Sequence, residues 1–220
     1  MTAPLHFADA REAADLAAFL ARLIHYDRAA AVRLQAGGGA LAVFGRPPSF
    51  EVLAIRTARL ADPAVFDRTV SAGELLEGIE ETAGKAVVPD MVTGPPWAGV
   101  LPPRGGWREL PGLPDVTGMR GAVAAAVAEF RARDEELPPE RRTRAERDRL
   151  GREIWSRTLA ETPLPLRAVH AAHSLGFLPP QEVPVALLTA GTWLRLRTPY
   201  GSIALRTPGS GLTLSVRPLA

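Results

Sequence analysis

The strongest constraint on the fold is a period-two alternation of apolar and polar residues close to the C-terminus. A strand buried on one face needs this pattern, because successive side chains leave a strand on opposite sides. In residues 192–198 the apolar side carries Leu194 and Leu196. The other side carries Trp193, Arg195 and Arg197. The alternation therefore predicts a strand with an apolar and a basic face.

Two turn signals extend this strand into a meander. Pro199 suits the second position of a type I turn, and Gly201 can take the left-handed conformation that often follows. Residues 203–206 return, Pro208 to Gly211 turn the chain again, and residues 212–216 form a third strand. An apolar sheet face must be covered, so we expect helices from upstream to pack on it. The apolar positions are Leu194, Leu196, Ile203, Leu205, Leu212 and Leu214.

The rest of the chain predicts helices and strands in both halves. Asp9 and Glu12 form a capping box that opens an amphipathic helix, and Ser71 with Glu74 opens another that Gly84 ends. Between these helices we expect strands near 32–35, 40–44 and 50–60, the last apolar on both faces and hence central. Three helices follow the middle of the chain, at about 116–137, 139–159 and 162–176.

This order of elements indicates an α+β fold in which antiparallel meander sheets are covered by helices, arranged as two similar lobes. The boundaries are an N-terminal α-βββ-α lobe over 1–86, a connecting loop over 87–114, and helices with the C-terminal meander over 115–220. Together they form one continuous globular unit. The layout resembles that of small secretion chaperones and adaptor proteins, a likeness of fold that no motif accompanies.

The connecting loop over 87–114 is rich in proline and glycine and contains Trp97 and Trp107. Its composition leaves no regular element, and a loop of this length inside a compact domain is either functional or a linker. Exposing two tryptophans would leave much apolar area in water. We therefore expect them to pin the loop onto the core, with ligand binding as the alternative.

Composition narrows the function classes. The chain has 220 residues, 26 basic and 24 acidic residues and a net charge of +2, so overall charge favours no nucleic-acid partner. Its one lysine, Lys85, indicates a GC-rich bacterial genome. No cysteine is present, which excludes disulfides and thiolate chemistry. Residues 1–12 show no secretory signal, and we expect a soluble cytoplasmic protein.

The arginine-rich segment 139–159 has two interpretations. Arginines on a helix can bind nucleic acid phosphates. Here, however, arginines and acids alternate at i,i+4 spacing, as in Arg144 with Asp148 and Arg149 with Glu153, which is typical of a solvated helix with paired charges. We favour the solvated helix.

Two further motifs carry no chemistry. His170 and His173 share a helix face and could chelate a metal, but without a third ligand they are expected to be packed in the structure. Residues 78–86 are only superficially similar to a phosphate loop, with the wrong spacing and alanine in place of the hydroxyl residue. We predict no catalytic residue, metal or cofactor.

The basic sheet face is the best candidate interaction surface. Arginine suits bidentate contacts with carboxylates, and Trp193 adds a flat surface for stacking. We expect a non-enzymatic adaptor, scaffold or chaperone-like protein that binds another protein or a second copy of itself, and no membrane. The alternative is a nucleic-acid-binding protein, and an enzyme comes third. The candidate residues are Trp193, Arg195, Arg197, Arg206, Arg217, Trp97 and Trp107.

Overall fold

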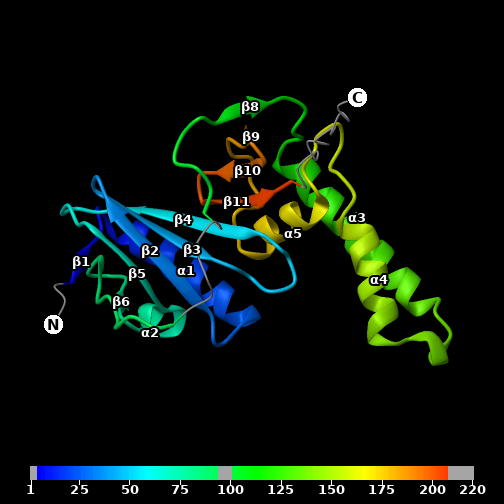
Figure 1. Ribbon diagram of the computed structural model, residues 1–220, viewed down its shortest axis with the longest axis horizontal. Helices are drawn as coiled ribbons and strands as arrows, with labels where there is room; N and C mark the ends of the chain where they lie inside the picture. Colours follow the sequence, from blue (N-terminus) through cyan, green and yellow to red (C-terminus); the bar gives the residue numbers. More distant parts are fainter. Residues whose placement is uncertain (1–3, 94–100, 208–220) are drawn as a thin grey trace, which may run out of the picture.

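The computed structural model describes residues 4–93 and 101–207 (Figure 1). An eight-stranded antiparallel sheet runs through the molecule, and a three-stranded sheet lies beside it. Helices pack against the large sheet, so the predicted α+β class is confirmed. The two meanders do not form separate lobes, because both belong to the one large sheet.

The first half begins as the sequence predicts. The side chain of Asp9 accepts a hydrogen bond of 2.9 Å from the backbone N–H of Glu12 and caps the first helix. A glycine turn joins the next two strands, and the following strand is buried at its first four residues, as expected for a central strand. These elements are β1 (Leu5–His6), α1 (Ala10–Tyr26), β2 (Ala31–Gly37), β3 (Ala40–Gly45) and β4 (Leu53–Arg59).

The end of the first half differs from the prediction in two ways. A strand that the sequence analysis missed, β5 (Phe66–Ser71), pairs with β2 at the edge of the sheet. The Ser71 cap is confirmed, but α2 (Ala72–Glu77) ends at Gly78 instead of continuing to Gly84. The residues beyond it form β6 (Ile79–Glu80) and β7 (Lys85–Ala86), which pair with each other, and β7 also pairs with β1. Pairing in this small sheet outweighs the helical pattern.

The middle of the chain also departs from expectation. The predicted absence of regular structure over 87–114 is wrong at β8 (Arg108–Leu110), an edge strand paired with the strand before the C-terminal hairpin. The second predicted helix is divided into a 3₁₀ turn, Pro139–Arg141, and α4 (Arg144–Trp155), because Thr143 caps a new helix start. The neighbouring helices are α3 (Val116–Glu135) and α5 (Leu166–Ser174), the latter starting later than Thr162.

The C-terminal meander joins the two halves. It consists of β9 (Ala186–Ala190), β10 (Trp193–Thr198) and β11 (Gly201–Arg206). Strand β11 pairs antiparallel with β4, so the order of the large sheet is β5-β2-β3-β4-β11-β10-β9-β8. The predicted third strand at 212–216 lies outside the described residues. The two meanders therefore share one sheet, in which β4 and β11 are the adjoining strands.

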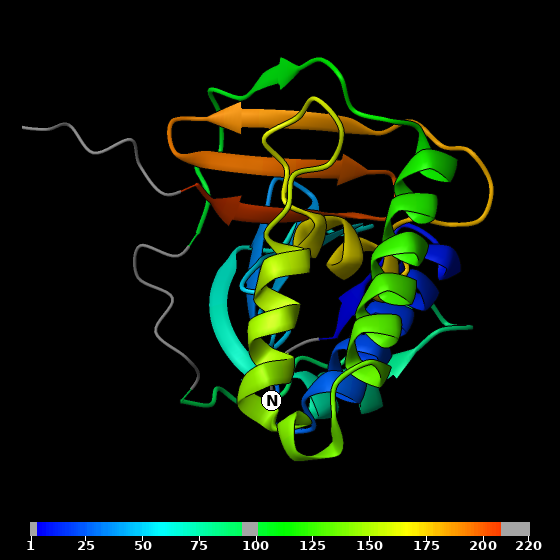
Figure 2. The ribbon, with the colours of Figure 1, turned by 90° about the vertical axis from the view of Figure 1, so that its right-hand side faces the viewer.

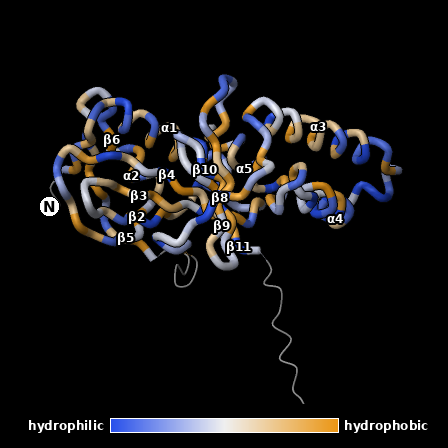
Figure 3. The backbone as a smooth tube through the Cα atoms, turned by 90° about the horizontal axis from the view of Figure 1, so that it is seen from above, coloured by the Kyte–Doolittle hydropathy of each residue, from blue (hydrophilic) through white to orange (hydrophobic). Residues whose placement is uncertain are grey.

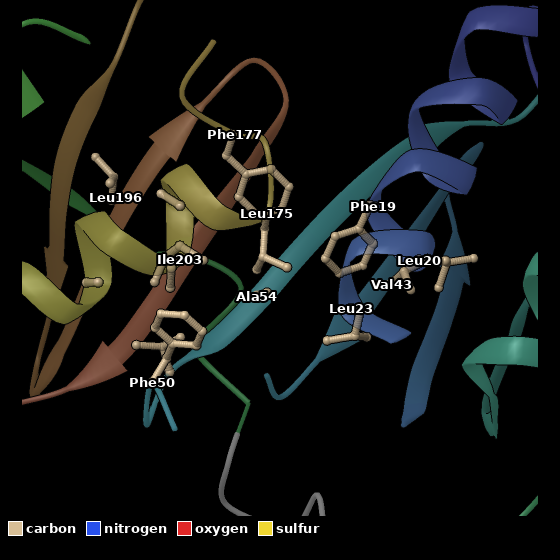
Figure 4. Packing of buried hydrophobic residues seen from close by; sticks show 14 of the residues in the cluster. Phe19, Leu20, Leu23, Val43, Phe50, Ala54, Leu175, Phe177, Leu196 and Ile203 are labelled. Carbon is tan, nitrogen blue, oxygen red and sulfur yellow. The ribbon is translucent and has the colours of Figure 1, made fainter. Parts of the chain in front are cut away.

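The main core lies on one face of the large sheet. Helix α1 covers the first half of that face and α5 the second half, and α3 and α4 pack on α5. Where the two halves meet, Phe19 of α1 stacks on Phe177 with ring centroids 5.6 Å apart (Figure 4). Helices α3 and α4 lie side by side and project beyond the sheet (Figures 1 and 2). Much of α4 is hydrophilic (Figure 3).

Candidate functional site

The C-terminal alternation places its residues on the two predicted faces. Leu194 and Leu196 belong to the main core. Arg195 lies on the opposite face, where it is half-buried, and Arg197 on the same face is exposed. In the register of the hairpin, Trp193 is opposite Arg206. Arg217 and Trp97 lie outside the described residues, so four of the predicted strand positions share this outer face.

Trp193 is not available as the stacking surface that we expected. Its side chain is only 8% exposed and belongs to a second apolar cluster on the outer face of the sheet. The guanidinium of Arg206 lies 5.1 Å from its ring centroid. The segment that follows residue 100 crosses this face and covers the tryptophan, which the strand alternation alone could not reveal. The cluster consists of Phe44, Leu53, Ile55, Trp193 and Ala204, with Ala42, Leu101 and Trp107 packed against it.

Trp107 holds this covering segment in place. Its indole N–H donates a hydrogen bond of 3.0 Å to the carbonyl of Pro103, and its half-buried ring packs on the outer cluster. The expectation that Trp107 pins the loop onto the core is therefore confirmed for the cluster on the outer face. The same ring supports the guanidinium of Arg195, which lies 5.7 Å from the ring centroid.

Arg195 has an unusual set of neighbours. Its Nε and Nη2 both donate to the hydroxyl of Ser202, at 3.0 and 2.8 Å. Burial lowers the pKa of Arg195, and the positive charge of Arg197 lowers it further. No carboxylate of the described residues forms an ion pair with Arg195 or Arg197, although every aspartate and glutamate of the chain lies within the described ranges. Within the described residues, this half-buried cation thus lacks a carboxylate as counter-charge.

A groove of about 820 Å³ opens beside Arg195, between the outer face of the sheet and residues 101–104. Its apolar floor includes Phe44 of β3 and Ile55 of β4. Val65, at the far end, is 89% exposed. Exposed apolar surface beside polar groups is typical of binding sites. We call this region, with Arg195 at its side, the outer groove; Arg197 lies two residues further along β10.

The acidic residue at the far end of the outer groove is already neutralised. Arg33 donates two hydrogen bonds of 2.8 Å to Asp67, and Gln35 donates a third of 2.9 Å. These bonds, led by that of Arg33, lower the pKa of Asp67 despite its partial burial, and the charge of Arg104 acts in the same direction. The uncompensated charge along the groove is therefore positive.

Three of the four arginines of α4 form ion pairs, as the solvated interpretation predicts, two of them within α4 and one with α3. Between the helices, Arg147 of α4 forms an ion pair with Asp134 of α3 at 2.7 Å, and Arg133 of α3 forms one with Glu153 of α4 at 2.7 Å. Arg144 and Asp148 are 3.9 Å apart, the one i,i+4 pair from the sequence analysis that the described structure contains. The charged faces of the two helices are thus directed toward each other, leaving few free cations for phosphates.

The ion pairs between α3 and α4 predict a loss of stability in acid. The hydrogen bond from Arg133 lowers the pKa of Glu153 from 4.5 to about 2. Because the folded pKa is depressed, the stabilisation is complete above about pH 4.5 and is lost as the pH falls toward 2. An NMR titration of the Glu153 carboxyl should give a midpoint well below 4.5, and Glu153→Gln should weaken the decline of the thermal midpoint in that window. A normal midpoint would contradict the prediction.

The two histidines are packed, as expected. The ring of His170 stacks on Trp155 with centroids 4.3 Å apart, and Nδ1 of His173 lies 3.3 Å from Nη1 of Arg120. Burial lowers the pKa of both, aided by His173 for His170 and by Arg120 for His173. Among the residues that the structure describes, no three His, Asp or Glu side chains are grouped to hold a metal.

Sequence reasoning missed Arg56, which connects the two halves. It lies in β4, is 4% exposed, and its Nη2 contacts Asp15 of α1 at 3.0 Å. Its Nη1 donates a hydrogen bond of 2.8 Å to the carbonyl of Tyr200 in the β10–β11 turn. An arginine inside the apolar run of a central strand was the available signal, because such a residue must find partners when buried.

The comparisons with known proteins match the two halves of the chain to different family models. Among the residues that the structure describes, no helix is long and apolar enough to cross a membrane. A search of curated proteins found no match. Residues 1–99 match the family model described as Domain of unknown function (DUF8010). Residues 102–210 match a second model, described as Domain of unknown function (DUF8185).

Proposed function

We propose that the protein is a non-enzymatic adaptor that binds an acidic segment of a partner protein in the outer groove. The observation that carries this proposal is Arg195, a half-buried guanidinium with a hydroxyl and an indole ring as neighbours but no carboxylate among the described residues. Removing a charge from water is unfavourable unless the charge is paired. A carboxylate from a partner would supply the missing counter-charge.

The shape of the outer groove supports a peptide-like partner. Its floor of Phe44 and Ile55 can accept apolar side chains, while Arg195 and Arg197 receive acidic ones along the same strand. Arg104 stands on the covering segment, at the other side of the groove. Arginine forms paired hydrogen bonds with carboxylates, so the three arginines favour a segment with acidic and apolar residues interleaved.

Nucleic acid suits this surface less well. Non-specific binding of single strands uses aromatic side chains on which bases stack. Trp193 is buried and Trp107 is half-buried beneath Arg195, so neither ring of the described surface is free for stacking. Three of the four arginines of α4, the other candidate for phosphate binding, are paired with Asp134, Glu146 and Asp148.

The proposal predicts that reversing the charge of Arg195 and Arg197 removes binding of acidic peptides. We would titrate the protein with a fluorescein-labelled peptide of alternating glutamate and leucine and follow anisotropy. Arg195→Glu with Arg197→Glu should weaken the affinity at least about tenfold, which corresponds to roughly 1.4 kcal/mol. Arg197→Glu alone, at an exposed position, should give part of the loss without affecting the fold.

A matched control is available on α1 and in the turn after it. Arg11 and Arg28 are exposed, and changing both to glutamate alters the net charge by the same amount. This control should bind the peptide normally. Equal weakening by both double variants would reduce the effect to overall charge and contradict the proposal. Binding of a single-stranded oligonucleotide with a log–log salt slope of about 0.9 per phosphate contact would support nucleic acid instead, and groove-dependent dimerisation in the ultracentrifuge would support a second copy.

A further inference from the structure

We propose that a second site, a cleft between α4, α5 and residues 49–51, binds a small organic anion with a flat apolar body, such as an aromatic carboxylate or sulfonate. The cleft has a volume of about 640 Å³ and lies on the helical side of the molecule, away from the outer groove. Its size falls within the range of small-molecule sites. Neither of its walls is used in the proposed adaptor function, so the two proposals are independent.

Aromatic side chains form the apolar wall of the cleft. Trp155 of α4 and His170 of α5 are stacked at an interplanar angle of 23°. The ring of Phe50 meets His170 edge-on, with centroids 5.2 Å apart, and Phe130 of α3 completes the wall. Such rings present flat faces to a planar ligand. Burial lowers the pKa of His170, so this part of the wall is neutral at pH 7.

Two arginines that line the cleft, Arg152 and Arg167, lack full partners among the described residues. Nε of Arg167 is buried and makes no hydrogen bond, and its nearest carboxylate oxygen, on Glu51, is 3.8 Å away. The Glu51 side chain is 81% exposed, so it competes weakly for this arginine. Arg152, one helix away, is exposed at the rim and forms no ion pair within the described part of the chain. Buried unpaired donors of this kind are rare in proteins and call for a partner.

The backbone on the open side of the cleft is held in an unfavourable conformation. Ser49 and Glu51 have φ angles of +71° and +53°, although neither is glycine. Residues with a Cβ adopt such angles at a cost, and these conformations cluster at binding and active sites. Phe50 lies between the two and is 7% exposed. The strained pair thus holds the Phe50 ring against His170.

A glycine in the middle of α4 keeps the cleft open. Gly151 lines the cleft, and an added Cβ would lie 3.7 Å from both Phe130 and Trp155, an ordinary contact distance. Packing therefore does not require glycine here, and alanine is the better helix former. A methyl group at this position would occupy space between the two rings. The glycine is explained if that space receives a ligand.

The test uses a pair of fluorescent probes that share a shape and differ in charge. The anion is 1-anilinonaphthalene-8-sulfonate and its neutral counterpart is N-phenyl-1-naphthylamine. The protein should bind one equivalent of the anion, with more than tenfold weaker binding in Arg152→Gln combined with Arg167→Gln. The neutral probe should lose less than twofold. Arg152→Gln alone, at an exposed position, should show the same selectivity to a smaller extent.

Two further variants separate a binding site from a general surface effect. Gly151→Ala should raise the thermal midpoint of the protein and yet weaken both probes about tenfold or more, since its methyl group narrows the cleft between Phe130 and Trp155. Arg144→Gln, on the same helix but 96% exposed and outside the cleft, should change nothing. Stronger or unchanged probe binding in Gly151→Ala, or equal losses of the charged and neutral probes in the arginine variants, would overturn the proposal.

Discussion

Replacing Arg56 by methionine is expected to destabilise the protein by roughly 2–4 kcal/mol. The guanidinium connects Asp15 of α1 at 3.0 Å with the carbonyl of Tyr200 at 2.8 Å. Methionine would fill similar space but leave both acceptors without their donor. Removing one partner of a buried ion pair costs about 3–5 kcal/mol. The lower range applies here because the Asp15 side chain is 32% exposed and Nε of Arg56 is itself unpartnered.

The matched control lies on the same strand. Arg59 also pairs with Glu12, at 2.8 Å, but its side chain is 69% exposed. Arg59→Met should therefore destabilise the protein much less than Arg56→Met. Urea unfolding followed by circular dichroism gives both values. Equal losses of unfolding free energy in the two variants would contradict the prediction. They would mean that neither the burial of Arg56 nor its bond to the β10–β11 turn contributes to stability.

The sequence predicts those elements whose local pattern and tertiary environment agree. The Asp9 cap, the apolar stripe of α1 and the alternation of β10 each correspond to the observed element. Strand β5 was missed because Val70 is its one buried residue. An edge strand of this kind shows almost no alternation of apolar and polar residues by which it could be recognised. Its pairing with β2, including the bonds from Arg33 to Asp67, holds it in the sheet.

The candidate site was predictable in part for a related reason. Alternation specifies on which side of a strand Arg195 lies, and the structure agrees. It cannot specify what lies above that side, because the covering residues are almost 90 positions away in the sequence. The burial of Trp193 follows from Leu101 and Trp107, and neither carries a local signal of its destination. The groove itself is a product of this long-range contact.

The boundary between the two matched family models does not coincide with a boundary in the large sheet. The models divide the chain near residue 100, yet β4 from the first and β11 from the second are adjacent in one sheet. Each half alone would expose an edge strand with unpaired backbone groups, a known route to aggregation. We therefore propose that the halves fold as one unit, held by β4–β11, Arg56 and the stacked Phe19 and Phe177 rings.

The second large effect is expected at this same junction, in Gly201→Ala. The Cβ of an alanine at this position would lie 2.5 Å from Cζ of Phe177 and 2.6 Å from Cε1. Phe177 is 2% exposed and stacked on Phe19, so moving its ring away from the added Cβ would disturb that stacking. The φ angle of Gly201 is +154°, which residues with a side chain rarely adopt. Overpacking and backbone strain together should cost about 2–4 kcal/mol.

A second glycine separates the two contributions. Gly191, in the turn before β10, has a φ of +57° and no atom within 4 Å of an added Cβ, so Gly191→Ala measures backbone strain alone, about 1 kcal/mol. Because the clash in Gly201→Ala involves one ring, Phe177→Leu should cost less in that background than in the wild type. A double-mutant cycle measures this coupling, which we expect to exceed about 1 kcal/mol. Additive losses would show that Gly201 and Phe177 do not constrain each other, and the junction would then depend on Arg56 and strand pairing.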